Sequence, residues 1–360
     1  MSTSRYGLLA GGNFIVDYVK IVDHFPEENM LAHIISESMG NGGGPYNVLK
    51  DLAAMKADFP LAAVGMVGND LNGTWIEADC RSNGIDTSQL HRSPLAPTSY
   101  TDAMTVRSTG RRTFFHQAGA NTLLDGDHFD FTKTKARLFH LGYLMLLERL
   151  DQIDENGRTR ASHVLERAKA AGLETSVDIV STENPQFSQI ARSALPYTDH
   201  LIINEVEAGK IVGCALDTDD LAGISEAAEE ILALGVGRSV VIHFEEGAVA
   251  AEKNAAVIVR GSLELPDGYS KGATGAGDAF AAGYLYGVHE CWSLEKRIDL
   301  AICTAAACLT HPTPSAGLSP MADCLAIAHS YPHRSLSELP CHCPKKSSKP
   351  SASLVAMAKS

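Results

Sequence analysis

The sequence predicts an α/β protein, a three-layer sandwich in which helices flank a mostly parallel central sheet, with a small β-strand lid beside it. Strand-like and helix-like segments alternate along most of the chain, which is typical of βαβ units. Two segments interrupt this alternation, at about residues 14–38 and 98–117, and each indicates consecutive strands without a helix between them. A turn of small residues before an apolar helix, at residues 272–280, adds a place where such a fold can bind an anion.

Short runs rich in aliphatic and β-branched residues predict the buried strands, at 7–10, 61–67, 137–142, 174–179, 200–203 and 239–244. Helical spacing of apolar residues predicts the helices, at 47–57, 72–83, 155–171, 205–212, 221–234, 278–289 and 294–310. Because helices separate many of these strands, we expect a mostly parallel sheet covered by helices on both faces. Ligands of such sheets bind at the carboxyl ends of the strands.

The second interruption predicts a hairpin whose turn is Ser108-Thr109-Gly110. Antiparallel strands attached to a parallel sheet favour a flap or lid that closes over a ligand. An ordinary decoration of the sheet edge explains the same pattern, and both interpretations stay open.

Composition limits the classes of partner. The 360 residues are 45% hydrophobic and 20% charged, which is typical of a soluble globular protein with a large core. We assign residues 1–339 to one folded domain and expect the polar, basic residues 340–360 to be a disordered tail. The net charge of −13, with no basic stripe, disfavours nucleic acid as a partner. The sequence has no run of the ~20 apolar residues that a membrane-spanning helix needs.

The cysteines and the amino terminus favour a cytoplasmic location. The 8 cysteines are scattered, unlike a disulfide framework, and the first residues lack the apolar core of a signal peptide. Cys341-His342-Cys343 is a weak candidate for metal binding, because no second pair of ligands lies nearby.

The strongest functional candidate is Asp278, which follows Gly275-Ala276-Gly277 and opens an apolar helix. Free backbone N–H groups and the helix dipole attract an anion to such a turn, and small residues let it approach closely. A carboxylate beside an anion pocket makes chemical sense as a base that removes a proton while the pocket holds a phosphoryl group. The alternative is that Asp278 only complements the helix dipole.

Three further polar positions each have two interpretations. Asn47, after a glycine-rich segment, can bind a sugar hydroxyl or cap the following helix. Asp17, soon after the first strand, can accept hydrogen bonds from vicinal hydroxyls or occupy a turn. Asn204 and Glu207 form a capping-box pattern, or they order the water shell of a Mg²⁺ that carries nucleotide phosphates.

Taken together, these motifs resemble the ribokinase-like sugar kinases of the phosphofructokinase B type, over roughly residues 7–320. The resemblance rests on the order of Asp17, the Gly42-Gly43-x-Pro45-x-Asn47 loop, Gly119-Ala120-Asn121, Asn204-x-x-Glu207 and Gly275-Ala276-Gly277-Asp278. It implies an ATP-dependent kinase, a phosphotransferase that acts on a hydroxyl of a sugar or sugar-like small molecule. It also implies an α/β sandwich with a β-lid and a requirement for Mg²⁺.

The resemblance also implies the roles of the site residues. Asp278 would be the base, and the N–H groups of Gly275, Ala276 and Gly277 would form the anion hole. The acceptor would be held by Asp17, Gly42, Gly43 and Asn47. Asn204 and Glu207 would order Mg²⁺ through water, without a direct protein ligand. The nucleotide base would lie between residues 240–250 and 300–317.

Two alternatives share this scaffold: a nucleoside kinase, and a non-catalytic protein that senses a sugar or nucleotide. Pairing of lid strands between two subunits would give a homodimer. Gly272-Ala273 stands where the family commonly has Asp-Thr, which leaves dependence on a monovalent cation open. The acidic pair Glu245-Glu246 near the donor site is a second departure from the family pattern, without a sequence-based explanation. The sequence does not identify the acceptor or its reacting hydroxyl.

Overall fold

The computed structural model describes residues 5–336, and within them nine strands form one central sheet. From edge to edge the strands are β13 (Ile258–Gly261), β12 (Gly247–Glu252), β11 (Ser239–Phe244), β10 (His200–Asn204), β9 (Glu174–Ile179), β8 (Leu138–Leu144), β1 (Leu8–Gly12), β4 (Leu61–Gly68) and β5 (Ile85–Ser93). The strands from β11 through β5 run parallel, and β12 and β13 add an antiparallel edge. The predicted mostly parallel sheet is confirmed.

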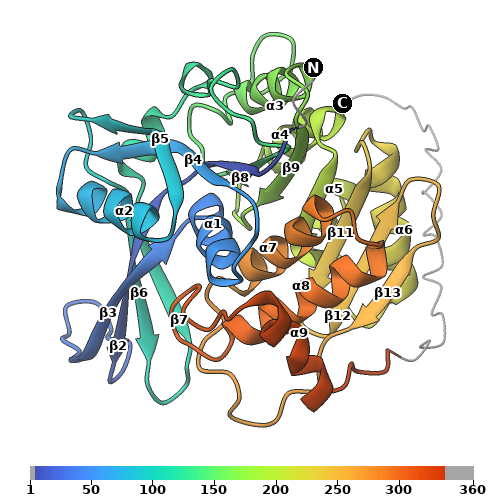
Figure 1. Ribbon diagram of the computed structural model, residues 1–360. Coiled ribbons are helices and arrows are strands. Elements are labelled where there is room, and N and C mark those ends of the chain that lie inside the picture. Colours follow the sequence, from blue (N-terminus) through green and yellow to red (C-terminus); the bar gives the residue numbers. More distant parts are fainter. Residues whose placement is uncertain (1–4, 337–360) are drawn as a thin grey trace, which may run out of the picture.

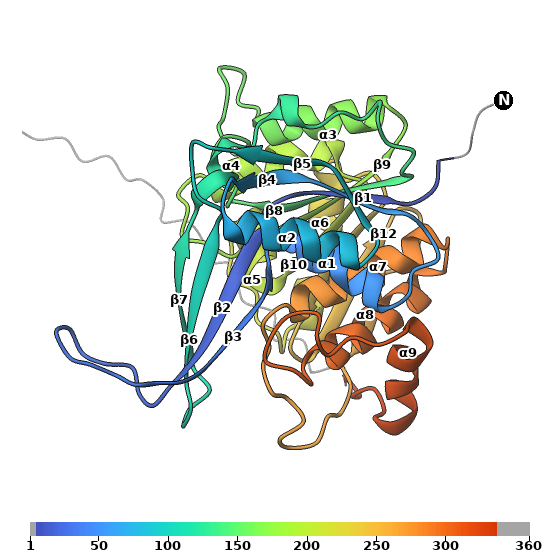
Figure 2. The same cartoon turned by 60° about the vertical axis from the view of Figure 1, so that its left-hand side comes forward.

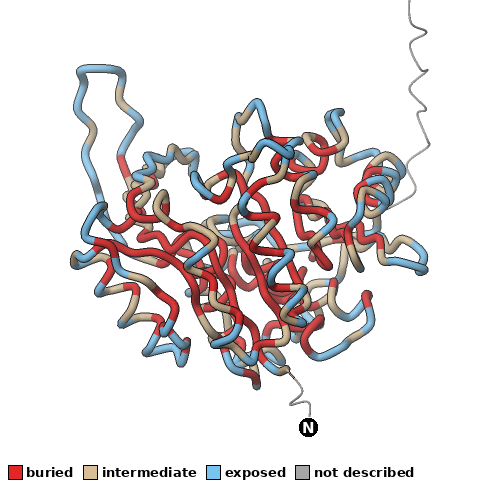
Figure 3. Tube along the Cα trace, turned by 90° about the horizontal axis from the view of Figure 1, so that it is seen from above, coloured by how far each residue is buried: buried red, intermediate tan, exposed pale blue. Residues whose placement is uncertain are grey.

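Helices cover both faces of this sheet and make it the middle of three layers (Figure 1). One face packs against α3 (Arg160–Ala170), α4 (Phe187–Ala194), α5 (Glu205–Val212) and α6 (Leu221–Ala233). The other packs against α1 (Gly44–Ala54), α2 (Leu71–Ser82), α7 (Ala276–His289), α8 (Leu294–Cys308) and α9 (Met321–Ser330). Buried residues concentrate in the central strands, which are red in Figure 3, and exposed residues lie at the periphery.

Helix α7 is buried around its whole circumference from Asp278 to His289, which explains why its sequence has no polar face. Its small residues allow close packing against α8. A side chain at Gly283 would meet the hydroxyl of Thr304, and the Thr304 hydroxyl already bonds the backbone oxygen of Ala279 at 2.8 Å. The start of α7 is therefore held rigidly in the core.

The lid is a separate four-stranded sheet, in the order β3 (Ile34–Gly42), β2 (Ile15–Val22), β6 (Tyr100–Val106) and β7 (Arg112–Gln117). Figure 2 shows it projecting from one end of the main body. Both interrupted segments of the sequence contribute strands to it, so the predicted consecutive strands are confirmed, and the smaller sheet is consistent with a lid. The chain that enters β2 is clamped by Asn121, whose side-chain oxygen accepts a hydrogen bond from the N–H of Phe14 at 3.3 Å.

Several predicted boundaries were wrong. The helix expected at 155–171 begins only at Arg160, because Thr159 caps it and Asp154 closes a turn before it. The helix expected at 47–57 begins at Gly44. Strand β5 escaped prediction because its buried positions include the polar residues Thr87, Gln89 and Ser93, and β12, β13, α4 and α9 were also not predicted. The predicted tail at 340–360 and the Cys341-His342-Cys343 motif lie outside the described residues.

Candidate active site

The turn before α7 has the geometry of an anion-binding site. Gly275 caps the helix with φ +81°, a left-handed conformation that glycine adopts without strain. Within residues 5–336 the backbone N–H groups of Gly275 and Gly277 have no hydrogen-bond partner. The N–H of Ala276 makes only a long 3.3 Å bond to the carbonyl of Ala273. The sequence predicted that the helix begins at Asp278. In the structure α7 begins at Ala276, so Asp278 lies within its first turn.

Two hydrogen bonds orient the Asp278 carboxylate. The Asn47 amide donates to Oδ2 at 2.7 Å, and the Tyr143 hydroxyl donates to Oδ1 at 2.6 Å. The side chain is only 4% exposed, yet it lies against the open turn of Gly275–Gly277. These contacts join α1, the end of β8 and α7 at one point.

Asn47 does not cap its helix. Gly43 is the N-cap of α1, and Asn47 lies one turn inside the helix with its side chain turned toward Asp278. Its own oxygen accepts a hydrogen bond from the Asn41 amide at 2.7 Å, and that amide also donates to the Ser315 hydroxyl at 2.9 Å. The capping interpretation of Asn47 was therefore wrong, and its amide orientation is fixed by two neighbours.

Asp17 comes from the lid rather than from the main sheet. It lies on β2, paired with Gly40 and Thr101. A side chain at Gly42 would overlap the Asp17 carboxylate, so glycine there makes room for it. Gly43 is equally constrained, because its φ is +89° and a side chain would strike the backbone of Asn13.

The carboxylates at this point affect one another. Burial and the neighbouring charge of Asp178 raise the pKa of Asp278 to about 7, and the bonds from Asn47 and Tyr143 oppose this rise. Burial and the charge of Asp278 raise the pKa of Asp17 to about 7. The structure therefore brings Asp17, Asn47 and Asp278 together, with a carboxyl group able to accept a proton near neutral pH.

Asn204 and Glu207 form the predicted capping box at the start of α5. The Asn204 side chain accepts from the Glu207 N–H at 2.8 Å, and the Glu207 carboxylate accepts from the Asn204 N–H at 2.9 Å. The Ser181 hydroxyl holds the second Glu207 oxygen at 2.8 Å. Burial, followed by the charges of Asp178 and Glu205, raises the pKa of Glu207 to about 8. Glu207 is thus linked to the site through Asp178, without a direct contact to Asp278.

Sequence reasoning missed Asp178 and Tyr143. Asp178 lies near the carboxyl end of β9, where one oxygen has no hydrogen-bond partner among the described residues and His140 Nε2 lies 3.6 Å from the other. A lone carboxylate near the carboxyl end of an apolar strand was the available signal. Tyr143 gave no such signal, because a tyrosine in an apolar strand is typical of core packing.

The residues present fit a magnesium ion held through water. Across residues 5–336, no three His, Cys, Asp or Glu side chains lie close enough together to ligate a metal directly. Asp178 and Glu207 are nevertheless both buried carboxyl groups, and the charge of Asp178 raises the pKa of Glu207, so a divalent cation between water molecules would relieve their repulsion. The oxygen of Asp178 without a partner is the natural acceptor for such a water.

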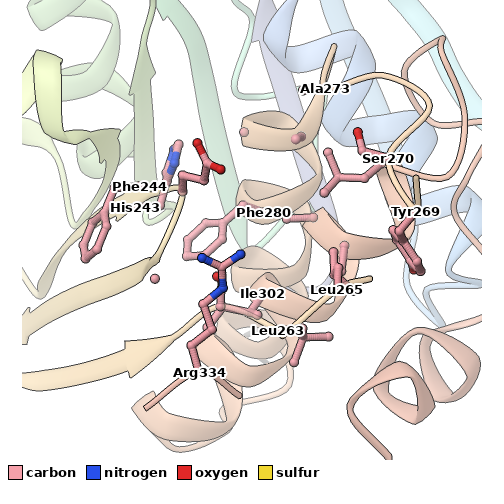
Figure 4. Close-up of a pocket in the computed structure, with 18 of the residues that line it drawn as sticks. His243, Phe244, Leu263, Leu265, Tyr269, Ser270, Ala273, Phe280, Ile302 and Arg334 are labelled. Carbon is pink, nitrogen blue, oxygen red and sulfur yellow. The ribbon is translucent and has the colours of Figure 1, made fainter. Parts of the chain in front are cut away.

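A cavity of about 660 Å³ begins at the anion-binding turn. Residues 243–245 and 247 line it on one side, and residues 302, 305, 306 and 309 line it on the other. These belong to the two segments expected to enclose a nucleotide base. His243 lies beside Phe280 with ring centroids 5.0 Å apart (Figure 4), and burial lowers its pKa to about 4. Of the acidic pair, Glu245 lines the cavity while Glu246 does not.

Comparison with known proteins agrees with this geometry. The profile of the pfkB family of carbohydrate kinases matches residues 8–320. The ATP-dependent ribose-1-phosphate kinase of Halopiger xanaduensis is 25% identical over 322 residues, 89% of this chain and 96% of that protein. The ribokinase of Arabidopsis thaliana, solved with ribose and ATP, has a TM-score of 0.73 at 21% identity, covering 90% of this chain and 98% of its own. Giardia lamblia ribokinase has a TM-score of 0.74 at 21% identity, covering 91% and 99%.

Proposed function

Because the chain belongs to the pfkB family of carbohydrate kinases, we propose that it transfers the terminal phosphoryl group of ATP to a hydroxyl of a sugar or sugar-like small molecule. The observation that carries this proposal is the buried Asp278 carboxylate, held by Asn47 and Tyr143 beside the free N–H groups at the start of α7. Phosphoryl transfer needs mainly alignment and charge stabilisation, which this arrangement can supply.

Each group has a role in the proposed reaction. Asp278 accepts the proton of the attacking hydroxyl, while the turn of Gly275, Ala276 and Gly277 stabilises charge on the transferring phosphoryl group. Asp17 and Asn47 hold other hydroxyls of the acceptor. Gly42, which leaves room for the Asp17 carboxylate, and Gly43 would contact the acceptor through their backbone. Asn204, Glu207 and Asp178 would order the water around Mg²⁺, which when bound neutralises phosphate charge.

A panel of acceptors tests the proposal. Purified protein with ATP and Mg²⁺ should consume ATP only when a suitable free sugar, sugar phosphate or nucleoside is present. A ribonucleoside as best acceptor would identify a nucleoside kinase of the same fold. Ligand binding without turnover across the whole panel would identify a non-catalytic sensor and refute the kinase assignment.

The lid is proposed to close over the bound acceptor. Its inner face carries Asp17, and the Arg112 side chain of β7 contacts the hydroxyl of Thr274 directly before the anion-binding turn. We expect acceptor plus a non-hydrolysable ATP analogue to slow amide hydrogen exchange in β6 and β7 by about tenfold or more. Helix α3, on the opposite face of the central sheet, serves as the internal control. Equal exchange in β6 and β7 with and without ligands would contradict lid closure.

Changing Tyr143 to phenylalanine should move the acid limb of the kcat/KM profile to higher pH. Activity requires the unprotonated base, so it falls as pH drops through the Asp278 pKa of about 7. The Tyr143 hydroxyl bond lowers that pKa, and its loss raises it further. The measurement is kcat/KM from pH 5.5 to 9, with Tyr197→Phe, away from the site, as control. An unshifted or downward-shifted acid limb would count against Asp278 as the base.

The assembly and location of the protein are also proposals. Phe114, Phe115, Met30 and Leu31 are exposed on the lid, and their burial would favour a homodimer through lid strands. Light scattering in solution measures this, and a monomer at micromolar concentration would exclude it. No helix within residues 5–336 is long and apolar enough to cross a membrane. A cytoplasmic location is supported by the cysteines of the described part, which are all free, and cell fractionation tests it.

A further inference from the structure

A segment beyond the matched domain completes the wall of the donor cavity. After α9 the chain returns to the sheet, where His333 forms a bridge with Leu263. The Arg334 N–H donates to the Ser262 carbonyl at 2.7 Å, and the Glu264 N–H donates to the Pro332 carbonyl at 2.9 Å. These backbone bonds fix the position from which the Arg334 side chain extends.

Arg334 is the one lysine or arginine among the described residues that line the cavity. The acidic residues of the lining are Glu205, Glu245 and Asp267, and none of them forms an ion pair with Arg334. His243 adds no positive charge near neutral pH, because burial lowers its pKa to about 4. A half-buried guanidinium whose side chain has no hydrogen-bond or ion-pair partner among residues 5–336 suits a ligand with hydrogen-bond acceptors.

The position of Arg334 identifies the part of the ligand that it faces. Figure 4 shows its guanidinium beside Phe280 and Ile302, at the end of the cavity away from Ala273 and the anion-binding turn. A nucleotide whose phosphates lie at the start of α7 would extend its base toward this end. The apolar side chains of Phe280, Ile302 and Leu263 suit the faces of an aromatic base.

The guanidinium group donates hydrogen bonds and accepts none. A 6-oxopurine offers two adjacent acceptors, O6 and N7, which match its fork, whereas adenine presents an amino donor beside N7. We propose that Arg334 recognises the donor base and that the cavity binds 6-oxopurine nucleoside triphosphates, such as GTP and ITP, in addition to ATP. This inference rests on the proposed function only in taking the cavity as the donor site.

Nucleotide binding to the unmodified protein gives the first test. In competition against a fluorescent nucleotide, GTP and ITP should bind at least as tightly as ATP. 7-Deaza-GTP, which lacks the N7 acceptor, should bind about tenfold more weakly than GTP. GTP and ITP binding more than tenfold more weakly than ATP would overturn the inference, and so would equal binding of GTP and 7-deaza-GTP.

Variants give the second test. Arg334→Gln should weaken GTP binding about tenfold, with less than about a twofold change for ATP. Arg334→Lys keeps the positive charge but loses the paired N–H donors of the guanidinium. It should therefore also weaken GTP binding relative to ATP binding. Arg81→Gln on the exposed side of α2 is the matched control, and melting temperatures establish that each variant folds. An equal loss for ATP and GTP, or no loss, would overturn the inference.

These readouts measure binding, so they separate the two proposals. Base discrimination without turnover leaves the inference standing and refutes the proposed function. Turnover with ATP, but without base discrimination or dependence on Arg334, refutes the inference alone.

Discussion

Replacing Asp278 by asparagine should lower kcat by a factor of about 10² to 10⁴ while leaving ATP binding nearly unchanged. The amide has almost the same shape as the carboxylate but does not accept the proton of the attacking hydroxyl. Asn47 can still donate to the retained oxygen, and the Tyr143 hydroxyl can rotate to accept from the new amide, so the local fold should persist. Steady-state turnover with the best acceptor, together with ATP affinity, measures both effects.

The control for this variant is Asp86→Asn, an exposed carboxylate far from the site. It should retain full turnover. The Asp278→Asn variant should also lose the acid limb of the pH profile that is due to the Asp278 pKa of about 7. Turnover within about threefold of the unmodified enzyme would refute the role of Asp278 as base.

Replacing Gly12 by alanine should destabilise the protein by about 4–5 kcal/mol or more, among the largest effects of a single substitution. Gly12 ends β1 with φ +131°, and a side chain there would overlap the backbone carbonyl of Gly142 on the neighbouring strand β8. Relief would require β1 and β8 to separate, and β8 carries Tyr143. Soluble yield and thermal unfolding measure the effect.

Gly84→Ala is the control that separates the steric overlap at Gly12 from the strain of a positive φ alone. Gly84 has a similarly unusual φ of +72°, but a side chain there meets nothing within 4 Å. We expect it to cost only about 1 kcal/mol. A melting temperature for Gly12→Ala equal to that of Gly84→Ala would mean that the strands accommodate the added methyl group.

The fold was predictable from sequence because local patterns and tertiary packing agree over most of it. Strands β9 and β11 and helix α5 begin and end as predicted, since each is a compact run between clear turn or capping residues. Failures cluster where a local pattern is weak. Strand β5 buries the polar residues Thr87, Gln89 and Ser93, which hides its apolar alternation. Helix α4 has only 8 residues, so its apolar residues, although they are spaced at the helical period, form a short pattern.

The candidate site was less predictable, because its contacts join distant segments. Each of Asp17, Asn47 and Asp278 was a candidate in its own local pattern, but no local pattern reveals that Asn47 donates to Asp278. The same limit explains the wrong capping interpretation of Asn47, since a glycine can supply the N-cap backbone geometry instead. Tyr143 and Asp178 both affect Asp278, the first by a hydrogen bond and the second by its charge. Only the folded chain brings these residues next to Asp278.

The hydrogen bond between Asn47 and Asp278 spans 231 residues of chain, which has a consequence for biosynthesis. While the ribosome is still making the later segments, the nascent polypeptide already contains most of the sheet but lacks α7 and α8, which cover one of its faces. Helices α1 and α2 have already been made, but the apolar part of that face that α7 and α8 cover stays exposed until those two helices emerge. We expect this exposed apolar surface to favour aggregation of chains that end before α7, and such chains also lack Asp278 and should be inactive.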